Sequence, residues 1–130
     1  MKLAIAVHGA PYSSQSSATA LRFARAALAA GHSLVRVFFY HDGVHTANAL
    51  AVPPQDEASP LPGWIQIAEE HGVELAVCIA AALKRGLVDA AERDRYELSA
   101  ASLHPAFTLV GLGQLVDAVA ASDRFVTFPA

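Results

Sequence analysis

The sequence predicts an α/β fold, a three-layer α/β/α sandwich around a mostly parallel sheet of about five strands. Short, continuously apolar runs, which are typical of strands buried on both faces, alternate along the chain with segments of helical periodicity. This alternation implies right-handed crossover connections between parallel strands. The chain has 130 residues, 54% of them hydrophobic and 16% charged, which suits a single domain over residues 1–130 with one buried core.

The first part of the chain is expected to supply two strands and the helix between them. Residues Lys2–Val7 are continuously apolar after the lysine and predict a buried first strand. A helix is expected over 16–31, and residues 33–40, rich in β-branched and aromatic side chains, predict the second strand. The Asp42-Gly43 pair then predicts a turn. The apolar face of the helix contains Leu21, Ala24 and Leu28.

The middle of the chain is expected to add a loop, a helix and a third strand. Four of the seven prolines fall in 52–63, which cannot continue a helix or pair as a central strand, so a surface excursion is expected. Residues 63–72 predict a short helix that stops at a glycine, and 73–77 predict the third strand. That strand leads directly into Cys78, the only cysteine, and residues 79–86 then predict another short helix.

The last part of the chain is expected to contain two helices and two strands. Asp89 and Glu92 imitate a capping box and predict a polar helix. Residues 107–111 predict a short fourth strand, 111–123 a helix and 124–128 the last strand. The apolar face of the last helix contains Leu112, Leu115, Val116 and Val119.

Charge and composition exclude several classes of function. Nine Lys and Arg against twelve Asp and Glu give a net charge of −3, so the chain has no basic field for direct binding of a nucleic acid. The apolar run at the N-terminus is too short to span a bilayer and has no Ala-x-Ala cleavage site, so no membrane association or secretion is expected. A single cysteine cannot form an intrachain disulfide, and the expected compartment is the reducing cytoplasm.

The carboxyl ends of the parallel strands are the expected place for chemistry. The segments 8–17, 41–48 and Cys78 each follow a predicted strand, so they should meet at one edge of the sheet. A thiol at the start of a helix faces unpaired amides and a positive dipole, and such settings lower thiol pKa values from about 8.5 towards roughly 3.5–7.5. Cys78 is therefore the candidate catalytic residue. The alternative is an inert packed thiol, since free cysteine is among the most buried residue types.

The other polar residues near this edge have simpler explanations. Lys84 and Arg85 lie almost two turns beyond the cysteine, where they are expected to cap carbonyls of the short helix. Tyr12 either closes over the site or packs. The loop after the first strand lacks the G-x-x-x-x-G-K-[ST] pattern that binds phosphate, and Ser16 or Ser17 is expected to cap the next helix.

The histidines show no metal-binding pattern. His41 and His45 are four residues apart, but the Asp-Gly between them predicts a turn, and a third and fourth ligand are not evident. They are expected to be exposed loop residues. The other histidines flank the ends of predicted elements, where they are expected to satisfy backbone groups: His8, His32, His71 and His104.

Several segments of the sequence resemble the TusD/DsrE family of sulfurtransferase subunits. FFYHDGVHTAN is similar to the family's aromatic strand, turn and Asn, and VCIAAALKRGLVD resembles its cysteine segment. FTLVGLGQLVDAVAASDRFVTF resembles its C-terminal helix and last strand. With the loop GAPYSSQSSATALRFA, the resemblance runs from about residue 1 to residue 128. The Pro-rich segment 52–63 is a departure from the family pattern.

The resemblance implies a parallel α/β/α domain in which one cysteine, here Cys78, carries a sulfane sulfur as a persulfide. It implies a heterohexamer with TusC- and TusB-like subunits, a TusA-like sulfur donor and a TusE-like acceptor, with 2-thiolation of the tRNA wobble uridine as the end of the pathway. Sulfur exchange between thiols requires neither a metal nor an organic cofactor, so none is expected.

The sequence is also compatible with other functions. DsrE-type relatives serve sulfur oxidation instead of tRNA thiolation, and both types share the cysteine segment. A noncatalytic assembly subunit of the same fold, with Cys78 as a packed thiol, is a further alternative. A flavodoxin-like ligand binder that uses the strand-end loops would need a small molecule that the sequence does not demand.

Overall fold

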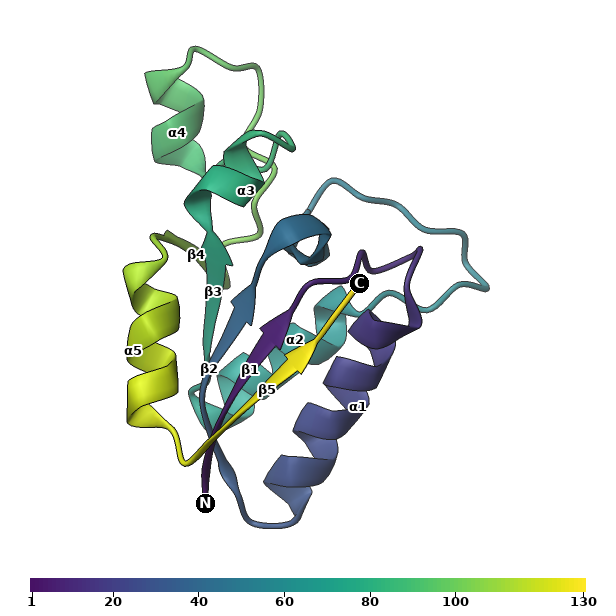
Figure 1. The fold of residues 1–130 in the computed structure, drawn as a ribbon. Helices are drawn as coiled ribbons and strands as arrows, with labels where there is room; N and C mark the ends of the chain where they lie inside the picture. The colour runs from purple at the N-terminus through teal and green to yellow at the C-terminus, as the bar shows by residue number, and fades with distance from the viewer.

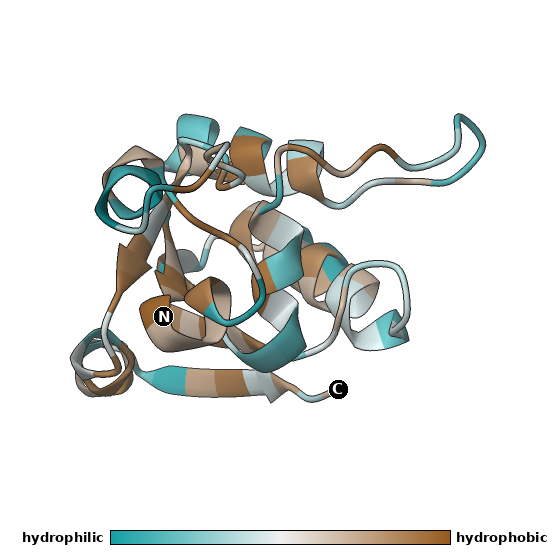
Figure 2. Cartoon of the chain, turned by 90° about the horizontal axis from the view of Figure 1, so that it is seen from above, coloured by the Kyte–Doolittle hydropathy of each residue, from teal (hydrophilic) through white to brown (hydrophobic).

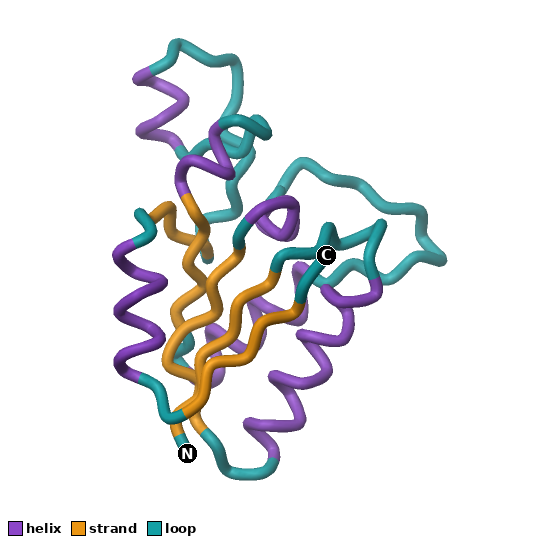
Figure 3. The backbone as a smooth tube through the Cα atoms, viewed as in Figure 1, coloured by secondary structure: helices purple, strands orange, loops and turns teal.

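The computed structural model describes residues 1–130 and contains one sheet of five parallel strands. The order of the strands is β4-β3-β2-β1-β5, and every pair of neighbours is parallel (Figures 1 and 3). The predicted α/β fold with a mostly parallel sheet of about five strands is therefore confirmed. The strands are β1 (Lys2–Val7), β2 (Ser33–Phe39), β3 (Glu74–Cys78), β4 (Phe107–Val110) and β5 (Arg124–Phe128).

The long helices cover both faces of this sheet. On one face lie α1 (Gln15–Ala29) and α2 (Leu61–His71), and on the other lies α5 (Gly113–Ala121) (Figure 1). The chain changes face at α5, because this helix crosses back over the sheet to deliver β5 beside β1. Three shorter helices lie at the carboxyl ends of the strands: the 3₁₀ helix η1 (His41–Ala47), α3 (Ile79–Leu83) and α4 (Ala90–Arg95).

A group of large aromatic side chains lies in the core between the sheet and the face of α1 and α2. Trp64 of α2 is fully buried and meets Phe39 of β2 edge-on, with ring centroids 5.4 Å apart. Phe39 also meets Phe107 of β4 at 5.4 Å. Buried aromatic pairs of this geometry contribute more than their buried area alone, so they fix the carboxyl end of β2.

An arginine on the opposite face attaches α5 to the sheet. Arg36 of β2 donates from Nε to Glu74 Oε2 at 2.8 Å and from Nη1 to the carbonyl oxygen of Gln114 at 2.7 Å. Its side chain is 11% exposed, so these partners compensate a nearly buried charge. Only part of the predicted apolar face of α5 is buried, since Leu112, Val116 and Val119 are exposed.

The first helix starts earlier than predicted. Ser14 is the N-cap of α1, and its Oγ accepts a hydrogen bond from the Ser16 N–H at 3.2 Å. The prediction that Ser16 or Ser17 is the cap was wrong, because the extended residue before the helix is Ser14 and both later serines lie within the first turn.

The Pro-rich loop is shorter than predicted, because α2 begins at Leu61 with Pro60 as its N-cap. Pro62 is tolerated in the first helical turn, where its missing N–H has no acceptor within the helix. The remaining loop extends away from the body of the molecule, and its tip is hydrophilic (Figure 2). No helix has the length and apolar character that crossing a bilayer requires.

Candidate functional site

The carboxyl ends of the strands bring the three predicted segments to one edge of the sheet (Figures 1 and 3). In the register of the sheet, Val7 pairs with Phe39, and Phe39 pairs with Val77. The residues that follow these three positions, His8, Tyr40 and Cys78, therefore lie at one level.

The strand pattern also places this row on the α5 face of the sheet. Side chains alternate along β3, so Cys78 shares a face with Glu74, which contacts Arg36 and through it α5. Tyr40 and His8 lie on the same face by the same alternation, and their ring centroids are 5.7 Å apart. The nearest neighbours of Cys78 across the strand ends are thus Tyr40 on one side and Val110, its partner in β4, on the other.

Cys78 itself is a buried free thiol. It is the last residue of β3 and the N-cap of α3, with φ −60° and ψ 118°, and the residue is 2% exposed. Its side chain makes no capping hydrogen bond, and it lines none of the surface cavities. The strand-to-helix junction predicted for the cysteine is present, and in the isolated chain the sulfur is covered.

The 3₁₀ helix η1 packs against both β3 and α3 and so flanks the cysteine. The predicted Asp-Gly turn is present, because Gly43 N–H donates to the Tyr40 carbonyl at 2.9 Å, but the chain then continues as a 3₁₀ helix to Ala47, which the sequence did not indicate. Gly43 is buried against β1, where an added Cβ would collide with the carbonyl oxygen of Val7. Only glycine lets η1 lie this close to the sheet edge.

An ion pair joins η1 to the end of the short helix that begins at Cys78. Arg85 donates from Nε to Asp42 Oδ1 at 2.9 Å and from Nη1 to the Ala81 carbonyl oxygen at 3.0 Å. Arg85 therefore caps a carbonyl of α3, as the sequence predicts, and also holds η1. Its hydrogen bond, with its charge, lowers the pKa of Asp42 below the usual range of that carboxyl. Lys84 is exposed and forms no ion pair.

Comparison with known proteins decides the family of this chain. Residues 1–128 match the model of the DsrE/DsrF-like family. The chain belongs to the DsrE/DsrF-like family. The sequence prediction of a TusD/DsrE-type sulfurtransferase is thereby confirmed at the level of the family.

Curated relatives in the DsrE/DsrF-like family cover nearly the whole chain. A putative sulfurtransferase DsrE from Allochromatium vinosum is 45% identical over 128 residues, 98% of each chain. A sulfurtransferase TusD from Serratia proteamaculans is 48% identical over 124 residues, 95% of this chain and 96% of the relative. A sulfurtransferase TusD from Salmonella arizonae is 47% identical over 128 residues, 98% of this chain and all of the relative.

A solved structure supports the same fold. The crystal structure of the ychN protein from E. coli matches with a TM-score of 0.73, covering 98% of this chain and 99% of that one. The two sequences are 23% identical, so this likeness concerns the fold alone.

Three rings form a cluster at the same edge of the sheet as Cys78, and the sequence pattern did not indicate it. The ring centroids of His8 and His41 are 4.9 Å apart, and those of Tyr40 and His41 are 4.0 Å apart. His41 adopts a left-handed backbone with φ 50°. The one available signal was that these residues follow neighbouring strands, since the spacing of residues along the chain does not reveal ring contacts.

The burial of His8 gives the edge of the sheet a pH dependence. Desolvation, and secondly the charge of His41, lowers the pKa of His8 from its ordinary value of 6.5. Folding thus favours neutral His8, so its stabilising contribution is complete above about pH 6.5 and declines as the pH falls below that value. When the pH is lowered from about 7.5 to about 5.5, we expect the free energy of unfolding to fall less in His8→Asn than in the parent. Urea unfolding at both pH values measures this, and equal losses in both proteins would contradict it.

The other candidates lie away from the cysteine. Tyr12 donates its hydroxyl to Ser59 Oγ at 3.2 Å and so ties its loop to the Pro-rich loop. It also lines a shallow cavity of about 220 Å³ together with His45. The structure contains no cluster of three or more His, Cys, Asp or Glu side chains that could hold a metal ion. His41 contacts the ring of His8, whereas His45 lines the cavity beside Tyr12.

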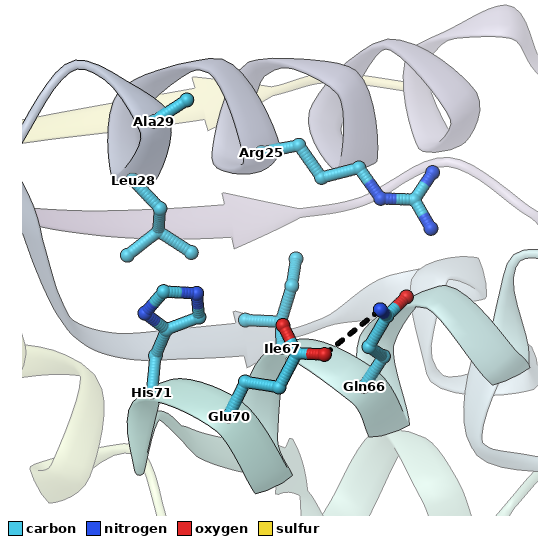
Figure 4. Close-up of a pocket in the computed structure, with 7 residues that line it drawn as sticks. All are labelled: Arg25, Leu28, Ala29, Gln66, Ile67, Glu70 and His71. Carbon is cyan, nitrogen blue, oxygen red and sulfur yellow. Dashed lines mark hydrogen bonds between the residues drawn. The ribbon is translucent and has the colours of Figure 1, made fainter.

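The remaining histidines differ in role. His104 Nδ1 accepts from the Ala106 N–H at 3.0 Å, as predicted for a residue that satisfies a backbone group, and His32 Nδ1 meets the N-terminal amine at 2.9 Å. His71 lines a cavity of about 210 Å³ between α1 and α2, where Gln66 donates to Glu70 at 2.9 Å (Figure 4). This cavity lies near the helix ends that lead into β2 and β3, at the opposite edge of the sheet from Cys78.

Proposed function

We propose that this protein is a sulfur-relay subunit in which Cys78 accepts a sulfane sulfur as a persulfide and passes it to a partner. The observation that carries the proposal is the position of the only cysteine, at a strand-to-helix junction on the carboxyl edge of a parallel sheet. The family membership supports it, because the curated relatives are named sulfurtransferases.

The proposed reaction consists of two exchanges between sulfur atoms. The Cys78 thiolate attacks the outer sulfur of a persulfide on the donor, so a new S–S bond forms at Cys78 and the donor leaves as a thiolate. A thiolate of the acceptor then attacks the outer sulfur on Cys78, and Cys78 leaves as a thiolate. Each exchange breaks one S–S bond and makes one, so the relay needs no oxidant, reductant or cofactor. With one cysteine, the persulfide cannot be discharged by an intrachain disulfide.

The TusD relatives favour tRNA thiolation as the pathway. On this proposal a TusA-like protein donates the sulfur, a TusE-like protein accepts it, and TusC- and TusB-like subunits complete a heterohexamer in the cytoplasm. The 2-thiolated wobble uridine of a tRNA is then the end product. The net charge of −3 fits a subunit that exchanges sulfur with proteins and does not hold the tRNA.

Two other proposals have an observation in their favour. The 45% identity to a DsrE protein favours a subunit that serves sulfur oxidation. The 2% exposure of Cys78 favours a noncatalytic assembly subunit, in which the thiol only packs.

Intact-mass analysis of the purified protein tests the proposal. The protein and its Cys78→Ser variant are exposed to a persulfide-loaded TusA-like carrier and measured before any reductant is added. We expect a gain of one or more sulfur atoms on the parent, which reductant removes and the variant lacks. No gain on a protein with an intact thiol and with its related subunits present would favour the assembly subunit.

A further inference from the structure

The burial of Cys78 means that part of the structure must move before its sulfur can react. The residue is 2% exposed, and it lines none of the surface cavities. A thiol exchange requires direct contact between the attacking sulfur and the sulfur attacked. β3 is hydrogen-bonded on both sides, to β2 and β4, so the strand that carries the cysteine is fixed. The elements at its carboxyl end, η1 and α3, contact each other, and both contact β3.

The junction between β2 and η1 has the features of a hinge. His41, the first residue of η1, is held at φ 50°, a conformation that a residue with a side chain rarely adopts. Such a conformation persists only where neighbouring contacts enforce it. The far end of η1 is fixed differently, because His104 N–H donates to the Ala47 carbonyl at 2.8 Å and Asn48 forms a bridge with Leu103.

One side-chain interaction closes η1 onto α3. Arg85 Nε and Asp42 Oδ1 lie 2.9 Å apart, and no other side-chain hydrogen bond or ion pair joins the two elements. Asp42 directly follows the strained His41, and Arg85 lies just beyond the helix that begins after Cys78. The ion pair therefore connects the hinge to the end of the helix that begins after the cysteine.

We propose that the Arg85–Asp42 ion pair is a latch that holds η1 closed against α3 and so limits access to the Cys78 sulfur. Arg85 is on this account a positioning residue, which acts through α3 and does not touch the reacting sulfur atoms. The role of the latch in sulfur exchange rests on the proposed function, but access to the thiol does not. Opening the latch lets the exposed start of η1, at His41 and Asp42, move away from α3, while the sheet and the buried Val44 and Ala47 of η1 stay in place.

The rate at which N-ethylmaleimide labels Cys78 in the native chain tests the latch. We expect Asp42→Asn and Arg85→Gln each to raise this rate by about two- to fivefold, the range of a partly exposed ion pair. The double variant should label no faster than Arg85→Gln, because Asp42→Asn breaks only the ion pair that Arg85→Gln has already removed. Sodium chloride at about 1 M, where the Debye length is ~3 Å, should speed labelling of the parent but not of the double variant.

Matched variants separate the latch from a general loss of stability. Arg93→Gln breaks a different exposed ion pair, to Asp94 at 3.0 Å, and should leave the labelling rate unchanged. The charge-reversed pair Asp42→Lys with Arg85→Glu should return the rate towards that of the parent. Low urea concentrations should change the rate only slightly, because opening a latch exposes much less surface than unfolding the chain.

Parental labelling rates in both single variants would overturn the latch, as would rates that rise with urea as steeply as global unfolding does. Uptake of sulfur from the persulfide-loaded carrier, measured on the same variants, tests the proposed function separately. If the labelling rates depend on the ion pair as expected but the protein takes up no sulfur, the proposed function alone is overturned. If the protein takes up sulfur but the variants and the parent label at the same rate, the latch alone is overturned.

Discussion

Cys78→Ser is expected to lower the rate of sulfur transfer by about three orders of magnitude or more, because it removes the only nucleophilic sulfur in the chain. A serine hydroxyl stays protonated at neutral pH and does not form a stable link to a sulfane sulfur. The rest of the edge, including Tyr40 and the Arg85–Asp42 pair, is unchanged by this substitution. The rate is measured as the appearance of persulfide on the acceptor when donor, subunit and acceptor are mixed.

A second variant separates loss of chemistry from loss of structure. Serine places a hydroxyl at a site that is 2% exposed, whereas Cys78→Ala leaves a small apolar side chain there. Both variants should lose transfer, and Cys78→Ala should keep the cooperative unfolding of the parent. Transfer at the parental rate in a folded Cys78→Ala protein would show that the thiol is inert.

Gly43→Ala is expected to destabilise the protein by about 1–3 kcal/mol, the typical cost of forcing an extra carbon into a packed site. The added Cβ would collide with the backbone carbonyl oxygen of Val7, which cannot turn aside as a flexible side chain can. Either β1 or η1 must shift. Because η1 packs against β3 and α3, we also expect faster labelling of Cys78 in this variant.

Gly113→Ala provides the matched control for this prediction. Gly113 is the first residue of α5, and an added Cβ there would meet no atom within 4 Å. Alanine also has the higher helix propensity, so Gly113→Ala should be neutral or slightly stabilising. Urea unfolding of both variants measures the difference, and equal stabilities would contradict the tight contact between η1 and β1.

The architecture followed from the sequence because its signals are local and repeated. Continuous apolar runs mark β1 and β3, and Gly72 ends α2 with φ 65°, as expected for a helix that stops at a glycine. Asp89 caps α4 by accepting from the Glu92 N–H at 2.9 Å, as the capping-box pattern predicts. The order of the strands could not be read this way, because it depends on contacts between distant segments.

The details of the candidate site could be predicted only in part. The position of Cys78 at a strand end follows from the pattern of the chain, but its burial depends on tertiary packing at the strand end, where η1 contacts β3 and α3. The partner of Arg85 is 43 residues away along the chain, so no local pattern indicates Asp42. The wrong choice among the serines has a similar cause, since several neighbouring serines can each cap a helix and only the backbone decides for Ser14.

The central claim, that sulfur passes through Cys78, is tested most directly by following a labelled sulfur atom. The complete protein is charged from a carrier with radiolabelled persulfide, freed of the carrier, and then mixed with an acceptor thiol protein. We predict that the label first resides on the parent protein and then appears on the acceptor at the rate at which it leaves Cys78. Label that reaches the acceptor equally well through the Cys78→Ala protein, or that never resides on the parent, would contradict the account.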